Sequence, residues 1–80
     1  MADQILLDRI VISREVAHGK PRIAGTRVMV YQVLDLLAAG KTPAEITGED
    51  YFPDLSEEDV RSCILYASRV IRDDRLVPAA

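Results

Sequence analysis

The spacing of apolar and polar positions predicts two short strands near the start of the chain. Residues 5–13 read as extended, and the apolar run within residues 9–13 has a β-branched centre, which is typical of a strand. Residues 21–26 are expected to form a second strand, with Pro21 at its start, where the missing N–H is tolerated. The two strands would make a hairpin. Its apolar run does not alternate, so we expect both faces to be buried, one of them against a second copy of the chain. We expect strand pairing between the two copies through Ile10, Val11 and Ile12.

Helical spacing begins after this hairpin. The pattern predicts a first helix over residues 28–40, with Thr26 as its N-cap and a glycine at its end. A short second helix follows Thr42, which is an N-cap. Pro43 takes its first helical position, and Glu45 completes a capping box.

A third helix begins after Ser56, an N-cap with three acidic residues in the turn that follows. Asp59 occupies the third helical position. The helix is predicted to bury one apolar stripe and to expose the rest of its surface. The stripe is Val60, Cys63, Ile64, Ala67, Val70 and Ile71, and the exposed positions are Arg61, Ser62, Leu65, Ser68, Arg69 and Arg72.

These elements predict a single domain over residues 1–80. We divide it into an N-terminal segment (1–8), a β element (9–27), a three-helix core (28–72) and a C-terminal tail (73–80). The expected fold is mainly α: a short N-terminal β-hairpin followed by a three-helix bundle with helix-turn-helix organisation. A chain of 80 residues has a thin core, which favours a homodimer.

Charge is unevenly distributed along the chain. The net charge is −3, yet residues 9–27 are basic, residues 35–59 are strongly acidic and residues 60–80 are mildly basic. Net acidity argues against non-specific binding of polyanions, while the basic segments allow a local anion-binding face.

The residues that carry most enzyme and metal chemistry are scarce. Cys63 is the one cysteine and His18 the one histidine, which argues against a disulfide within the chain and a zinc site. His18 is the sole general-base candidate near neutral pH, with no nucleophile placed beside it. We therefore expect no enzyme, no cofactor and no metal. The start of the chain does not read as a signal peptide, and no apolar run reaches membrane-spanning length, so we expect a cytoplasmic protein.

The most distinctive segment is GKPRIAGTR, residues 19–27, which concentrates cations, glycines and a proline. Ile23 is expected to anchor this stiff segment to the core, with Lys20, Arg22 and Arg27 facing outward. Fixed cations of this kind contact phosphates. The candidate DNA-contacting residues are Arg14, Lys20, Arg22, Thr26, Arg27, Arg61 and Arg69.

The order of several motifs resembles a known family. GKPRIAGTRV is followed by VYQVLDLLAAG, KTPAEI and FPDLSEEDVRSCILYA, a series similar to the bacterial domain-of-unknown-function family 433. The resemblance implies a homeodomain-like or winged-helix-like fold. It also implies an antitoxin of a type II toxin–antitoxin pair, which binds operator DNA and a toxin nuclease of the PIN-like type. It assigns no catalytic residues.

Two functions stay open from the residues themselves. DNA binding would depend on the basic segment, because the acidic start of the third helix repels a groove lined with phosphates. The alternative is a protein–protein interaction module or dimeric adaptor that does not bind DNA. A toxin would be bound through the acidic stretch 49–59 or through the tail, although helix-dipole complementarity also explains the acidic turn. The candidate toxin-binding residues are Tyr51, Phe52, Arg72 and Arg75.

Overall fold

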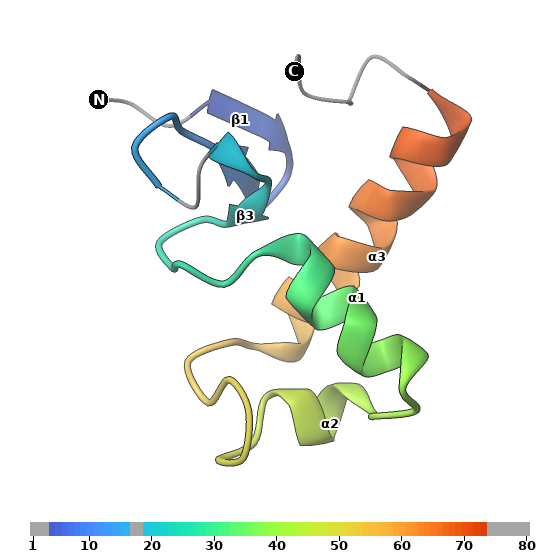
Figure 1. Cartoon of the computed structure of the whole chain (residues 1–80). Coiled ribbons are helices and arrows are strands. Elements are labelled where there is room, and N and C mark those ends of the chain that lie inside the picture. The colour runs from blue at the N-terminus through green and yellow to red at the C-terminus, as the bar shows by residue number, and fades with distance from the viewer. Residues whose placement is uncertain (1–3, 17–18, 74–80) are drawn as a thin grey trace.

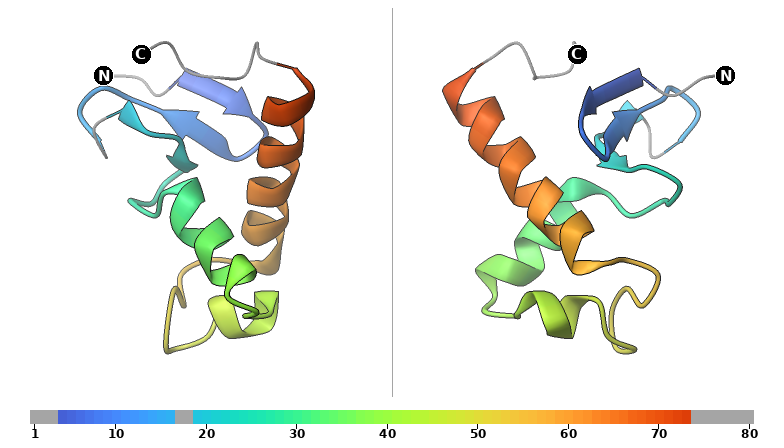
Figure 2. Two further views of the ribbon diagram at one scale, coloured as in Figure 1. Left: turned by 45° about the vertical axis from the view of Figure 1, so that its right-hand side comes forward. Right: turned by 180° about the vertical axis from the view of Figure 1, so that it is seen from behind.

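The fold combines a small antiparallel sheet with three helices (Figure 1). The computed structural model describes residues 4–16 and 19–73. The sheet lies at one end of the molecule and the shortest helix at the other, and the longest helix runs from beside the sheet toward the shortest one (Figures 1 and 2). The elements are β1 (Gln4–Leu7), β2 (Ile10–Ile12), β3 (Arg22–Ile23), α1 (Val30–Ala38), α2 (Pro43–Ile46) and α3 (Glu57–Arg72).

The sheet has one strand more than the predicted hairpin. β2 lies in the centre, between β1 and β3, and pairs antiparallel with both. The extended reading of residues 5–13 missed a tight turn at Asp8 and Arg9, where Asp8 has a φ of 52°. Aspartate tolerates this left-handed conformation better than most residues. The pairing of β2 with β3 confirms the predicted hairpin.

The central position of β2 overturns the expected route to a dimer. Both edges of β2 are paired within the chain, so no edge remains for a second copy. Ile10 and Val11 are buried in the chain itself, and Ile12 is half-buried. The prediction that these three residues pair between subunits was therefore wrong, while the homodimer stays a prediction.

The predicted starts of α2 and α3 are confirmed. The Thr42 hydroxyl accepts a hydrogen bond from the Glu45 N–H at 3.1 Å, and the Glu45 carboxylate accepts one from the Thr42 N–H at 2.9 Å. The equivalent pair at α3 is Ser56 and Asp59, at 3.2 and 2.9 Å. Each capping box satisfies two N–H groups that the first turn leaves without helical partners.

The start of α1 was predicted two residues too early. The helix begins at Val30, and the Met29 N–H donates to the Gln32 side chain at 2.9 Å. Its end agrees with the prediction. Gly40 has a φ of 93°, and the N–H groups of Gly40 and Lys41 donate to the carbonyls of Leu37 and Leu36, both at 3.0 Å. This pair of bonds is a Schellman motif, which needs a left-handed residue at this position.

The core joins the sheet to all three helices. The side of α3 that it buries differs in part from the predicted apolar stripe. Val60 and Cys63 are buried as expected, but Ile64 and Ile71 are 46% and 85% exposed. Ser62, expected outside, is buried, because this side of α3 faces the turn between β1 and β2. The buried core residues are Ile10, Ile23, Val30, Val33, Ile46, Leu55, Val60, Cys63 and Tyr66.

The fold class is therefore mixed α/β. The three predicted helices are present, but a three-stranded sheet packs against them through β2 and α3. The expectation of a mainly α bundle underestimated the sheet, since β1 was not separated from β2 in the sequence pattern.

Candidate interaction surfaces

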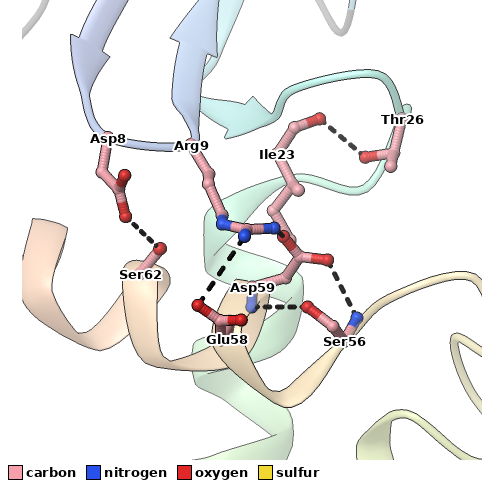
Figure 3. Close-up of polar contacts among 8 residues, drawn as sticks. All are labelled: Asp8, Arg9, Ile23, Thr26, Ser56, Glu58, Asp59 and Ser62. Carbon is pink, nitrogen blue, oxygen red and sulfur yellow. Dashed lines mark hydrogen bonds and ion pairs between the residues drawn. The ribbon is translucent and has the colours of Figure 1, made fainter.

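The turn between β1 and β2 is fastened to the first half of α3 (Figure 3). Asp8 accepts a hydrogen bond from the Ser62 hydroxyl at 2.9 Å. Arg9 donates from Nη1 to Asp59 Oδ1 at 3.0 Å, and its Nη2 lies 3.7 Å from Glu58 Oε2. One cation of the basic segment is thus paired with the acidic start of α3, so these charges have a structural role.

Asp59 is held as a carboxylate by this arrangement. Burial acts to raise its pKa, but the Ser56 N–H, the Arg9 guanidinium and the Ser56 hydroxyl together outweigh burial, and the net pKa is lowered. The side chain therefore caps α3 and binds Arg9 with the same charge.

The loop that follows β3 is closed by its own hydrogen bonds. The Thr26 hydroxyl donates to the Ile23 carbonyl at 2.8 Å (Figure 3) and accepts from the Val28 N–H at 3.0 Å. The Ala24 N–H donates to the Arg9 carbonyl at 2.8 Å. Gly25 has a φ of 77°, a left-handed conformation that glycine adopts without strain. Thr26 therefore shapes this loop and is not the N-cap of α1.

Arg22 does not face outward. It is 5% exposed, and its Nη2 donates to the Ser13 hydroxyl at 3.4 Å. The prediction of an outward Arg22 was wrong because β3 pairs with β2, which turns the side chain of Arg22 toward Ser13. Lys20 and Arg27 are exposed as predicted.

An apolar hollow of about 400 Å³ lies between the start of β3, α1 and the C-terminal half of α3, and we call it the α1–α3 groove. Tyr31 is 50% exposed on one side of it and Ile71 is 85% exposed on the other. Among the described residues that line it, Lys20 is the charged one. The groove is lined by Lys20, Pro21, Val30, Tyr31, Leu34, Tyr66, Ala67, Val70 and Ile71.

A second hollow, of about 570 Å³, lies between the loop after β3 and the segment that precedes α3, and we call it the loop pocket. Two arginines and two aspartates share it, so opposite charges offset each other there. It is lined by Arg9, Ala24, Gly25, Thr26, Arg27, Val28, Tyr51, Phe52, Pro53, Asp54, Leu55 and Asp59.

The predicted DNA-contacting cations are distributed over several parts of the surface. Lys20 lines the α1–α3 groove, whereas Arg27 lines the loop pocket. Arg14 is exposed just after β2, and the exposed Arg61 and Arg69 lie on α3. One of these predicted cations lines each hollow, so neither hollow gathers two of them.

The predicted toxin-binding residues are likewise separated. Tyr51 is exposed, and the Nζ of Lys41 lies 5.8 Å from the centre of the Tyr51 ring. Phe52 is half-buried against the core. Arg72 is exposed at the end of α3, and Arg75 lies outside the described residues. The segment after α2 and the last turn of α3 are at opposite ends of the molecule (Figure 1), so these residues do not form one patch.

The groove was not apparent from the amino-acid sequence. Tyr31 was read as one of many apolar helix positions, and Ile71 was assigned to the buried stripe. An aromatic residue near the start of a helix gives no sequence signal of exposure, because exposure depends on where the next element packs.

The Cys63 thiol is buried in the core. Burial and the nearby charge of Asp59 raise the pKa of the Cys63 thiol to about 12. Within residues 4–16 and 19–73, no three His, Cys, Asp or Glu side chains gather into a metal site. None of the helices in this part of the chain combines the length and apolarity that a membrane crossing requires.

The described residues form a small mixed α/β domain that carries an apolar groove and a polar pocket. The family model described as "Protein of unknown function (DUF433)" matches residues 10–67. The chain therefore belongs to this family. Comparisons with curated proteins and with solved structures found no match. The matched region runs from β2 into α3 and includes the whole loop after β3.

Proposed function

We propose that this protein is an antitoxin-type regulator that binds a partner protein in the α1–α3 groove. The observation that carries the proposal is the groove itself, an apolar hollow with Tyr31 and Ile71 exposed at its sides. A contiguous apolar surface of this kind is typical of a protein-binding site. The motif resemblance supports a toxin nuclease of the PIN-like type as the partner, and we place the pair in the cytoplasm.

The shape and chemistry of the groove favour one kind of partner segment. Side chains from two helices and the start of β3 line it, so it fits the apolar face of an amphipathic helix. Lys20 at its edge favours an acidic residue on that helix. The loop pocket fits less well, because its paired opposite charges would have to lose water without gaining a new partner.

Co-expression with the product of the adjacent gene, followed by affinity purification, tests this proposal. Tyr31→Lys and Ile71→Lys should each weaken the complex at least tenfold, because each places a charge in an apolar contact. Ile5→Lys is the matched control, since Ile5 is 71% exposed on β1, outside the groove. Loss of co-purification by the wild type, or full binding by both groove variants, would remove the proposal.

Operator DNA binding is a second candidate function. It is favoured by the exposure of Arg14, Lys20 and Arg27. Asp54 and Arg27 both line the loop pocket, so we expect Arg14 and Lys20 to contribute more to phosphate binding.

A gel-shift titration with the promoter of its own gene tests DNA binding. Affinity should fall as salt rises, and Lys20→Glu should weaken binding and reduce the salt dependence. Glu49→Gln, at an exposed position after α2, is the control. Absence of salt-sensitive binding would leave the alternative, a protein-binding module that acts without DNA.

A further inference from the structure

The outward side of α3 has an apolar centre and oppositely charged ends. Ile64 and Leu65, near the middle of the helix, are 46% and 41% exposed. Glu57 is the first residue of the helix and Arg72 the last. We call this surface the α3 outer face, and its exposed residues are Glu57, Arg61, Ile64, Leu65, Ser68 and Arg72.

This face lies opposite the core side of α3, and it adjoins the α1–α3 groove at Ile71. Successive residues of a helix are about 100° apart around its axis, which places the α3 outer face opposite the buried Cys63 and Tyr66. The groove uses Tyr66, Ala67, Val70 and Ile71 of the same helix. In the left view of Figure 2, α3 forms one side of the molecule.

We propose that the α3 outer face binds the same face of a second copy, with the two helices antiparallel. The two-fold axis would pass between Ile64 and Leu65, so that Ile64 of one copy packs on Leu65 of the other. Glu57 of one copy then lies opposite Arg72 of the other, and this pair occurs twice because a two-fold interface is self-complementary. Arg61 lies opposite Ser68, which is small enough to leave room for its long stem.

Charge complementarity selects this occupant and this orientation. Glu57 and Arg72 are separated along the axis by roughly 22 Å, so one end of the face is acidic and the other basic. Parallel helices would place like charges together, whereas antiparallel helices join opposite charges and oppose their dipoles. Arg9 forms ion pairs with Glu58 and Asp59, and Glu57 and Arg72 take part in neither of these pairs.

The dimer should be weak and sensitive to salt. One helix face on each copy buries less than a standard interface of about 1,600 Å². The charged pairs lie at the rim, where salt screens them. This inference goes beyond the proposed function, and it is tested on the protein alone, without a partner in the α1–α3 groove.

Sedimentation equilibrium over a range of protein concentrations tests the proposal through charge reversal. Glu57→Arg and Arg72→Glu each turn two attractive pairs into two repulsive ones, so each alone should raise the dissociation constant about tenfold. An equimolar mixture of the two variants should form a heterodimer at least as stable as the wild-type dimer, because both pairs are attractive again. A variant weakened only by poor folding would not be rescued in this way.

Matched controls separate this face from the rest of the surface. Ile64→Lys should abolish the dimer, while Ile5→Lys, at another exposed isoleucine, should leave it unchanged. Glu49→Arg is the matched charge reversal outside the face. A wild-type protein that stays monomeric at millimolar concentration would overturn the proposal. So would a dimer that is insensitive to Ile64→Lys, or a mixture of Glu57→Arg and Arg72→Glu that stays monomeric.

Discussion

Arg9 and Asp59 are 50 residues apart in the chain, yet Arg9 Nη1 lies 3.0 Å from Asp59 Oδ1. The contact joins the turn between β1 and β2 to the first turn of α3 (Figure 3). The other carboxylate oxygen of Asp59 accepts the Ser56 N–H at 2.9 Å. One carboxylate therefore both caps the longest helix and fixes the sheet against it.

The first prediction concerns the pH dependence of this contact. The pKa of Asp59 is lowered below its ordinary value of 3.8, so its contribution to stability is complete above that value and is lost as pH falls through the folded-state pKa. Asp59→Asn should therefore destabilise the protein at neutral pH, and its difference from wild type should shrink in strong acid. Urea unfolding at pH 7 and near pH 2.5 measures both differences. Equal differences at the two values would contradict the prediction, and Asp50→Asn is the exposed control.

The second prediction concerns the N-cap of α3. Ser56→Ala removes the hydroxyl that accepts the Asp59 N–H and should lower the free energy of unfolding by about 1 kcal/mol. Ser68→Ala, at an exposed position inside the same helix, should be neutral or slightly stabilising. Urea unfolding followed by circular dichroism compares the two variants, and equal effects would show that the cap contributes nothing particular.

The third prediction concerns the four-residue helix α2. Ile46 is its one buried residue and is fully enclosed by the core. Ile46→Ala should cost about 3 kcal/mol and Ile46→Val about 1 kcal/mol, because each leaves a cavity in proportion to the atoms removed. Thermal and urea unfolding measure the loss. A cost for Ile46→Ala as small as that of Ile5→Ala on the exposed side of β1 would contradict the assigned burial.

The fourth prediction concerns the end of α1. Gly40 has a φ of 93°, and a methyl group placed there would meet no atom within 4 Å. The cost of Gly40→Ala is therefore backbone strain alone, about 1 kcal/mol. Gly40→Asn should cost less, since asparagine adopts left-handed conformations more readily. If unfolding experiments show alanine to be tolerated better than asparagine at this position, the Schellman geometry is wrong.

The fifth prediction concerns Cys63. The thiol is fully buried, and burial with the charge of Asp59 raises its pKa to about 12, so little thiolate forms near neutral pH. A disulfide reagent such as DTNB should react slowly with the folded protein and rapidly in denaturant. Rapid stoichiometric reaction in native buffer would contradict this burial.

The sequence predicted local features well and long-range relationships poorly. The capping boxes at Thr42 and Ser56 and the glycine end of α1 depend on neighbours within a few residues, and all three are present. The burial of Arg22 and the exposure of Ile71 were predicted wrongly. Both depend on which distant element packs beside them, and periodicity within one helix or strand does not report this.

The amino-acid sequence by itself determined where α2 and α3 begin and where α1 ends, because caps, proline and glycine act through bonds to adjacent residues. It also determined membership of the family, through the motifs between β2 and α3. Only the tertiary structure decided which side of α3 is buried, since Asp59 and Ser62 are drawn inward by Arg9 and Asp8. With Asp59 and Ser62 on the inner side of α3, Ile64 lies exposed beside Leu65. These two residues form the face on which we expect two copies to meet.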